Sequence, residues 1–206
     1  RQFISLADKP TIVVATNNPG KLKEFALLLP NFKIISQSSL NISPEEELGE
    51  TFFENSLQKA RVANNASGMV SLGDDSGLIV PALNNLPGLR SARYAHENAT
   101  DEENRQYLRK ELEALDLNQT KAYFVCVLAL VQAPADPFPL IATGLLEGSV
   151  KTTMQGANGF GYDPMFYPKD SNTSLGEMNA EQKALLSHRG KAIQVLKRKI
   201  QGFASE

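Results

Sequence analysis

The sequence predicts an α/β protein with a mixed β-sheet. Short runs rich in β-branched and aromatic residues, typical of buried strands, alternate along the chain with segments whose apolar residues recur at helical spacing. Strands and helices that interleave in this way favour a sheet covered by helices. Apolar residues make up 42% of the 206 residues, enough for a sizeable core. This length fits a single domain over residues 1–206, with room for two lobes.

The N-terminal part predicts a strand, a loop and a helix in succession. Residues 11–16 are an apolar, β-branched run and form the first expected strand. The loop 17–20 breaks this run, and residues 22–29 carry apolar side chains at helical spacing until Pro30 ends the helix. A second strand is expected at 32–36.

A longer helix is expected from Thr51 onward. Phe53, Leu57 and Ala60 share one of its faces. Lys59 shares another face with Asn55, because residues four apart are neighbours on a helix.

The centre of the sequence is the run 73–77, Gly-Asp-Asp-Ser-Gly, between two apolar segments. Those flanking segments predict a strand, a tight turn and a second strand. The adjacent carboxylates of Asp74 and Asp75 repel each other unless a cation lies between them or one is protonated. Such a pair suits a hard divalent ion such as Mg²⁺. The alternative is an ordinary solvated turn, since Asp, Ser and Gly are common turn residues.

The second half of the chain continues the alternation. Thr100 and Glu103 form a capping-box signature at the start of a helix that reaches about Leu115. The remaining expected elements are strands at 122–131 and 140–146, joined as a hairpin, and helices at 180–186 and 191–200, separated by residues 187–190. Cys126, the one cysteine, is expected to be a buried small hydrophobe.

The turn at residues 16–21 has the features of an anion site. It lies between a strand and a helix start, where free backbone N–H groups and the helix dipole favour negative charge, and Lys21 adds a full positive charge. It is not a Walker A loop, because Ala15 and Leu22 occupy places where that motif needs Gly and Ser or Thr. The alternative is an ordinary turn with a solvated lysine.

An acidic loop could supply a further carboxylate. Glu45, Glu46 and Glu47 are consecutive, and such a run is usually a solvated surface. Together with Asp74 and Asp75 it would also give the oxygen-rich environment that Mg²⁺ prefers. Lys59 is interpreted as a surface lysine on the helix, the usual place for this residue type.

The run 159–164, Gly-Phe-Gly-Tyr-Asp-Pro, is unlike a solvent loop. Phe160 and Tyr162 offer flat faces, and stacking of a base on an aromatic ring is worth roughly 1–3 kcal/mol. The alternative is an aromatic turn that caps the core. His188 and Arg189 offer hydrogen-bond donors to a carbonyl oxygen, although a helix cap and a surface ion pair are equally open for them.

Composition restricts the partners. The formal net charge is −2, and the sequence has no long basic block, which argues against nucleic acid as the main partner. No apolar stretch reaches the roughly 18 residues of a membrane span. The first residues, 1–5, lack the apolar core of a signal peptide. We therefore expect a soluble, cytoplasmic protein that does not bind membranes.

Taken together and in order, these segments resemble the inosine triphosphate pyrophosphatase family. Each run is weak alone, but six in register across nearly the whole chain are specific. The matching runs are ATNNPGK (15–21), TFFEN (51–55), DDSGL (74–78), PG (87–88) with SARY (91–94), GFGYDP (159–164) and SHRG (187–190).

The resemblance implies a fold and an activity. The implied fold is an elongated, curved mixed β-sheet with flanking helices, and two lobes around a central cleft. The implied assembly is a homodimer. The implied reaction uses Mg²⁺ to convert dITP, ITP or XTP into the monophosphate and pyrophosphate, which removes non-standard purines from the nucleotide pool.

The resemblance also implies roles for individual residues. Asp75 is implied as the general base and a metal ligand, with Glu47 as the second metal carboxylate and Glu46 as the alternative to it. The residues implied to bind the substrate are Thr16, Asn17, Asn18, Pro19, Gly20, Lys21, Ser76, Phe160, Gly161, Tyr162, Asp163, Lys183, His188 and Arg189.

Two competing functions stay open at this point. A Maf-like nucleotide pyrophosphatase would perform similar chemistry on modified pyrimidines or standard nucleotides, and the aromatic loop with His188 and Arg189 argues for the purine-specific family instead. A non-catalytic nucleotide sensor would bind without hydrolysis. The place of Asp75 beside Ser76, together with the acidic loop, favours hydrolysis over sensing.

Overall fold

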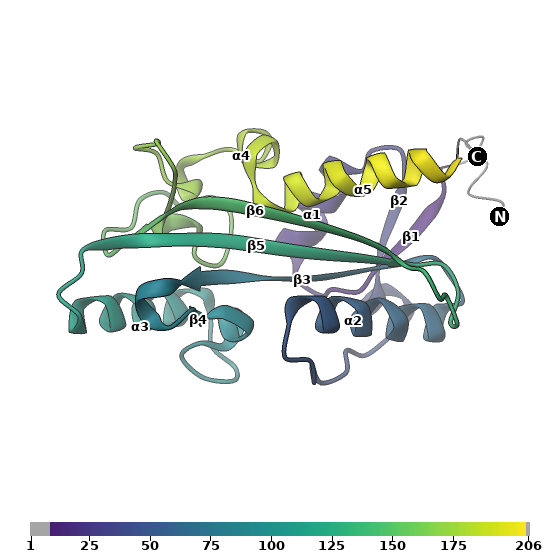
Figure 1. Ribbon diagram of the computed structural model, residues 1–206, viewed down its shortest axis with the longest axis horizontal. Coiled ribbons are helices and arrows are strands. Elements are labelled where there is room, and N and C mark those ends of the chain that lie inside the picture. Colours follow the sequence, from purple (N-terminus) through teal and green to yellow (C-terminus); the bar gives the residue numbers. More distant parts are fainter. Residues whose placement is uncertain (1–8, 205–206) are drawn as a thin grey trace. The chain divides into compact units, whose positions relative to one another are not determined.

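The computed structural model describes residues 9–204 (Figure 1). The first five residues, on which the signal-peptide expectation depends, lie outside this range. The strands are β1 (Thr11–Val14), β2 (Lys33–Ser36), β3 (Ser71–Val80), β4 (Leu86–Pro87), β5 (Gln119–Val131), β6 (Leu140–Lys151) and β7 (Phe166–Pro168). The α-helices are α1 (Pro19–Leu28), α2 (Phe52–Ser67), α3 (Asp101–Ala114), α4 (Ala180–Leu186) and α5 (His188–Ala204). Within the described residues, every helix is too short or too polar to cross a membrane.

The described strands form one mixed sheet of seven strands. Its order is β2-β1-β3-β5-β6-β7, with β4 paired to β3 away from this path. β1 is parallel to both β2 and β3, whereas β4 is antiparallel to β3 and β7 is antiparallel to β6. The expected α/β class with a mixed sheet is confirmed.

The described chain divides into two compact units. Unit 1 holds the chain up to Asp75, the segment Cys126–Gly144 and the chain from Arg189, and unit 2 holds Ser76–Val125 and Leu145–His188. β3, β5 and β6 each contribute residues to both units. The expectation of one domain over residues 1–206 stays a prediction.

The core of unit 1 lies on both faces of its strands. On one face, Ile12 and Val14 of β1 belong to a cluster with Phe25 of α1 and Ile193 of α5. The intervening Val13 faces Ala63 of α2 instead. Figure 1 shows α5 and α2 on opposite sides of the strands. Because successive side chains of a strand point to opposite faces, a strand buried on both sides needs a continuous apolar run, which is found at residues 12–15.

The core of unit 2 gathers around α3 and the aromatic loop. Leu108 and Leu112 of α3 are buried in one cluster with Tyr162 and Phe166. The predicted capping box of α3 is confirmed, because the Thr100 hydroxyl accepts from the Glu103 amide at 3.2 Å and a Glu103 carboxylate oxygen accepts from the Thr100 amide at 2.7 Å.

The tight turn predicted within residues 73–77 is wrong, because β3 runs through this segment as one continuous strand. Asp74 is 1% exposed there, so its carboxylate is satisfied inside the protein and does not need a solvated turn. Gly73 allows α2 to lie close to the strand. A Cβ at this position would come within 1.9 Å of the Ser56 carbonyl oxygen.

Three smaller expectations also need correction. α1 begins at Pro19, earlier than predicted, because Pro suits the first turn of a helix and Asn18 caps it. α5 begins at His188, so His188 and Arg189 lie in its first turn and not in a separate linker. Phe53 is 54% exposed, although Leu57 and Ala60 pack inward from the same helix.

Candidate active site

The turn between β1 and α1 is a structured helix N-terminus in unit 1. The Asn18 side chain caps α1 by accepting from the Lys21 amide at 3.0 Å, and the Thr16 hydroxyl accepts from the Asn18 amide at 3.1 Å. Asn17 is exposed at the tip of the turn. The first amides of a helix point outward and carry its partial positive charge, so this turn is suited to an anion.

Lys21 extends from this turn to a buried ionic network. Its ammonium lies 2.8 Å from Asp74 Oδ1, and the Arg189 guanidinium binds the same carboxylate through Nε at 2.6 Å and Nη2 at 3.3 Å. Arg189 also donates to Glu24 of α1 through Nη1. Burial opposes ionisation of Asp74, but Arg189 and Lys21 outweigh it and hold the pKa of this carboxyl well below its usual range. Asp74 is therefore a buried anion that fixes the Lys21 ammonium near the turn.

Asp75 has a different environment from Asp74. Its Oδ1 accepts from the Lys59 ammonium at 3.0 Å, and Glu47 Oε1 lies 3.1 Å from the same ammonium. Asp75 Oδ2 is buried and accepts no hydrogen bond from the described residues. Burial raises the pKa of Asp75; Lys59 offsets part of this effect and Glu47 adds to it, so this pKa lies above its ordinary value.

Lys59 is the cation that joins the two carboxylates. Burial lowers its pKa, but Asp75 and Glu47 outweigh that effect, so the pKa of Lys59 lies above its ordinary value and the side chain stays charged. The sequence suggested only a surface lysine here. The sequence held one indication of an inward position, because Lys59 lies four residues after Asn55 and therefore on the same face of α2. Asn55 is turned inward and accepts from the Gly49 amide at 2.8 Å.

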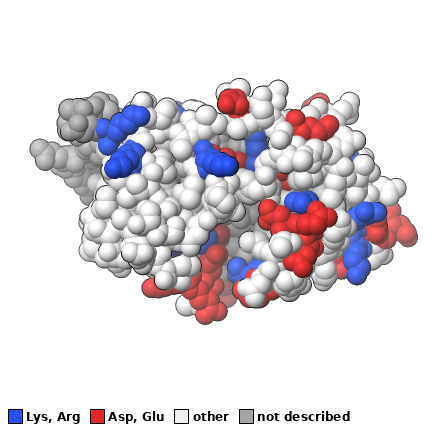
Figure 2. Space-filling model, turned by 180° about the vertical axis from the view of Figure 1, so that it is seen from behind, with Lys and Arg blue, Asp and Glu red and all other residues white. Residues whose placement is uncertain are grey.

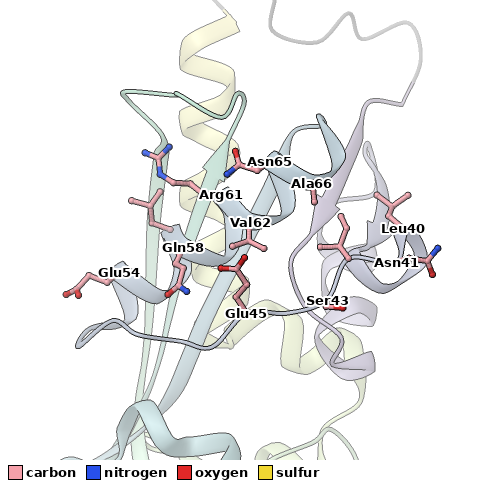
Figure 3. Close-up of a pocket in the computed structure, with 12 residues that line it drawn as sticks. Leu40, Asn41, Ser43, Glu45, Glu54, Gln58, Arg61, Val62, Asn65 and Ala66 are labelled. Carbon is pink, nitrogen blue, oxygen red and sulfur yellow. The ribbon is translucent and has the colours of Figure 1, made fainter.

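Some of these residues line a cavity of about 210 Å³ in unit 1. Thr16 and Asn17 of the turn, Glu47 of the acidic loop and Lys59 of α2 all line it. A wider hollow of about 920 Å³ lies along α2 and shares Glu45 with this cavity (Figure 3). The cavity therefore has the β1–α1 turn on one border and the carboxylates of Glu45 and Glu47 with Lys59 on another.

Glu47 and Asp75 have the donor chemistry for a hard cation. Both converge on one ammonium, and the unpartnered Asp75 Oδ2 is a carboxylate oxygen available for a ligand. Among residues 9–204 there is no cluster of three or more His, Cys, Asp or Glu side chains arranged to hold a metal. Two carboxylates nevertheless fit Mg²⁺, which commonly uses one or two of them and completes its shell with water and substrate phosphates. Glu46 is exposed, and its backbone carbonyl accepts from the side-chain amide of Gln58 at 2.7 Å.

The aromatic loop belongs to unit 2, where Lys183 and Asp163 organise it. Lys183 Nζ lies 2.6 Å from Asp163 Oδ2 and 4.2 Å from the centre of the Phe160 ring. The same Asp163 oxygen accepts from the Phe160 amide at 3.0 Å. Phe160 is half-buried, and these contacts hold it within the loop.

Tyr162 and His188 have structural contacts within unit 2. Tyr162 is buried, and its hydroxyl donates to the Ser91 carbonyl at 2.7 Å, so it offers no exposed ring face. For Tyr162, this arrangement agrees with the alternative interpretation given above, an aromatic turn that caps the core. The His188 ring stacks on Phe124 with 4.7 Å between centroids and 13° between planes.

The predicted site residues are thus distributed over both units. The residues in unit 1 are Thr16, Asn17, Asn18, Pro19, Gly20, Lys21, Glu47, Asp75 and Arg189; those in unit 2 are Ser76, Phe160, Gly161, Tyr162, Asp163, Lys183 and His188. Arg189 has partners that the sequence did not suggest, because Asp74 lies 115 positions away and no local pattern links the two. Glu24 was missed as well, although its spacing of three from Lys21 places both on one side of α1. The substrate-binding roles stay predictions.

A βα turn with a capped helix, a lysine and nearby carboxylates defines a class of α/β protein that binds phosphate-bearing small molecules. The chain belongs to the Ham1 family, whose model matches residues 12–199. The resemblance drawn from the motifs is therefore confirmed.

Relatives of known name and structure cover almost the whole chain. A protein of Legionella pneumophila (strain Lens) named dITP/XTP pyrophosphatase is 46% identical over 186 residues, which cover 90% of this chain and 96% of the relative. One of the same name from Haemophilus influenzae is 45% identical and covers 93% of this chain and 100% of the relative. The structure of a HAM1 protein from Coxiella burnetii is similar with a TM-score of 0.85 at 42% identity, covering 94% of this chain and 99% of that one.

Proposed function

We propose that this protein is a dITP/XTP pyrophosphatase, which hydrolyses these nucleotides to the monophosphate and pyrophosphate. The observation that carries the proposal is the juxtaposition in unit 1 of the capped β1–α1 turn, Lys21 and the carboxylates of Glu47 and Asp75. The names of the relatives, at 43–46% identity over most of the chain, give the substrate class.

The triphosphate is assigned to the β1–α1 turn. The Gly20 backbone amide and the Lys21 ammonium would offset its negative charge, while Thr16, Asn17, Asn18 and Pro19 shape the turn. Phosphoryl transfer demands little covalent chemistry from the protein, so positioning and neutralising charge are the main tasks. Asp74 supports this role because it binds the Lys21 ammonium, and Arg189 in turn binds Asp74.

Asp75 is assigned as the group that orients and deprotonates the attacking water. The water oxygen forms a bond to the α-phosphorus, the bond from that phosphorus to the α–β bridging oxygen breaks, and pyrophosphate leaves with the bonding electrons. The proton of the water passes to Asp75, whose pKa above the ordinary value suits a base. Glu47 and Asp75 would hold Mg²⁺, which neutralises phosphate charge when it is bound.

The base and sugar are assigned to the second group of residues. Phe160 offers a ring for stacking, Ser76, Asp163, Lys183 and His188 supply polar contacts, and Gly161 shapes the loop. Tyr162 is buried and is assigned a supporting role in the loop. A homodimer with a cytoplasmic location and no nucleic-acid partner completes the proposal. Figure 2 shows basic side chains only as small separate groups on the face it presents, unlike the continuous stripe typical of duplex binding.

Product analysis tests this function directly. The protein is incubated with dITP, with and without Mg²⁺, and the products are separated. We expect dIMP and pyrophosphate in equal amounts, loss of activity with a chelator, and recovery when Mg²⁺ is added back. Asp75→Asn is the matched inactive variant and should turn over at least roughly a hundredfold more slowly, the usual scale for losing a general base.

The same experiment separates the alternatives. Orthophosphate and dIDP as first products would contradict cleavage at the α–β linkage. Binding of dITP without any product would identify a sensor. Faster hydrolysis of standard or pyrimidine nucleotides than of dITP would favour a Maf-like activity.

A further inference from the structure

We propose that Asp101 and Arg105 of α3 are positioning residues that hold Gly161 from both sides and so fix the Phe160 ring for stacking on the base of the substrate. We call this pair the Gly161 clamp. The inference rests on the function proposed above, and it adds two residues that contact neither the phosphates nor the reacting atoms.

The clamp binds both backbone polar groups of one residue. Asp101 Oδ2 accepts from the Gly161 amide at 2.8 Å, and Arg105 Nη1 donates to the Gly161 carbonyl at 2.6 Å. Asp101 and Arg105 are four residues apart, so they lie on one face of α3. Each contact has a charged partner, and such hydrogen bonds are shorter and stronger than neutral ones.

The clamped segment has an unusual backbone conformation. Gly159 and Gly161 have positive φ angles of 72° and 60°, a conformation for which glycine is well suited but which costs it much entropy to hold. A Cβ at Gly161 would meet no atom within 4 Å. A side chain at this position would therefore point into open space, and the two side chains of α3 bind the backbone of Gly161.

Fixing Gly161 also fixes its neighbour Phe160. The Phe160 amide is bound by Asp163 on the other side, and Lys183 lies over its ring. The ring is thus held through its own amide, through the ammonium on its face and through the adjacent clamped residue. A ring ordered before binding gives tighter stacking, because less freedom is lost when the base arrives.

Arg105 is distinguished from the other arginine on the helix. Its side chain is 15% exposed and is oriented by Glu102, with 2.7 Å between Nη2 and Oε2. Arg109, four residues later, is 47% exposed and pairs with Glu113 at 2.8 Å. Both replacements remove one arginine and one helix ion pair, so Arg109→Ala is a matched control for Arg105→Ala.

The test combines amide exchange with kinetics on the full chain. Hydrogen–deuterium exchange is measured for a peptide that covers residues 156–164 in wild type, Arg105→Ala, Arg105→Lys and Arg109→Ala. KM and kcat for dITP are measured on the same samples, together with the inhibition constant of pyrophosphate, a probe that has no base. Thermal unfolding of each variant shows whether it is folded.

Loss of the bond to the Gly161 carbonyl in Arg105→Ala should let Gly161 move away from Asp101, which binds its amide. We expect exchange in that peptide to rise at least about tenfold, the scale of losing a hydrogen bond to a charged group. KM for dITP should rise by a similar factor while the pyrophosphate inhibition constant stays within about twofold, because a loosened ring weakens base binding only. Arg105→Lys keeps a charged donor and should recover part of both effects. Arg109→Ala should match wild type.

Other results would overturn the clamp. They are unchanged exchange in Arg105→Ala, an equal effect in Arg109→Ala, or equal weakening of dITP and pyrophosphate, which would indicate a general structural role. A wild-type protein that releases no pyrophosphate from dITP would instead overturn the proposed function, and the exchange comparison would still decide whether Gly161 is held by α3.

Discussion

Asp74 and Asp75 are adjacent residues, and their surroundings shift the pKa values of their carboxyl groups in opposite directions. Two cations neutralise Asp74 and keep its pKa low, whereas Asp75 shares one cation with Glu47 and has a raised pKa. Groups with such divergent environments commonly have different tasks in one site. We interpret Asp74 as the structural anion and Asp75 as the reactive one.

Glu47 and Glu46 can be separated by their effect on magnesium. Glu47→Gln keeps the size of the side chain and removes its charge, so the Mg²⁺ concentration for half-maximal hydrolysis of dITP should rise at least about tenfold. Glu46→Gln is the control and should have no effect, because Glu46 is exposed while Glu47 approaches Lys59. Titration of activity with Mg²⁺ measures both. A shift confined to Glu46→Gln would reverse the assignment.

Arg189 is expected to contribute mainly to stability. Its guanidinium is 1% exposed, and Arg189→Ala would leave Asp74 with Lys21 alone and would deprive Glu24 of its buried partner. Removing one member of a buried ion pair typically costs about 3–5 kcal/mol, so the free energy of unfolding should fall by roughly that amount. Urea denaturation measures it, with Arg198→Ala on the exposed side of α5 as control.

The motif suggested instead that Arg189 recognises the base of the substrate, and a kinetic measurement distinguishes this role from a structural one. Recognition of the base requires that Arg189→Ala lower kcat/KM for dITP more than for dATP. A selective loss of this kind with an unchanged free energy of unfolding would contradict the structural interpretation.

At the scale of elements, the close contact of α2 with β3 depends on Gly73, which has no side chain. The Ser56 hydroxyl donates to the Gly73 carbonyl at 3.1 Å and is also 2.9 Å from the Val127 carbonyl, so the helix is bound directly to two strands. α2 also carries Lys59, which approaches Asp75. The distance between this helix and the sheet therefore sets the geometry of the proposed site.

Gly73→Ala should disturb this contact. The added Cβ would lie 1.9 Å from a backbone oxygen of α2, so the helix must move away. We expect a loss of about 1–3 kcal/mol in the free energy of unfolding, the usual range for overpacking, together with a lower kcat for dITP. In Gly202→Ala the new Cβ would meet nothing within 4 Å, and better helix propensity should leave stability equal or slightly higher. Equal behaviour of the two variants would contradict the close contact.

The elements that the sequence predicted well are those encoded locally. The capping box of α3 and the apolar run of β1 depend on neighbours within a few residues, and both are confirmed. β3 was mispredicted because turn statistics favour Asp-Ser-Gly, whereas the pairing of β3 with β1 and β4 and the contact of Asp74 with Arg189 join residues distant in the sequence. For the same reason, the motifs did not indicate that Arg189 would bind Asp74 or that Tyr162 would turn inward.

At the scale of the whole molecule, both compact units carry part of the proposed machinery. Unit 1 holds the phosphate turn and the carboxylates, while unit 2 holds the aromatic loop. Asp75 and Ser76 are consecutive in β3 and belong to different units. β3 therefore connects Asp75, the proposed catalytic residue, directly to Ser76, the first residue of unit 2. Unit 2 carries the aromatic loop that is assigned to the base.

Assembly is the remaining prediction at this scale. The resemblance to the inosine triphosphate pyrophosphatase family implies a two-fold dimer, in which the same surface of each copy meets its equivalent. Large apolar side chains such as Leu48, 75% exposed, and Phe53, 54% exposed, would gain from being covered by a partner. Light scattering at micromolar concentration should therefore give about 45 kDa, twice the chain mass of 22.5 kDa. Dilution should shift this mass towards 22.5 kDa if the dimer is reversible, and a constant 22.5 kDa at all concentrations would contradict the dimer.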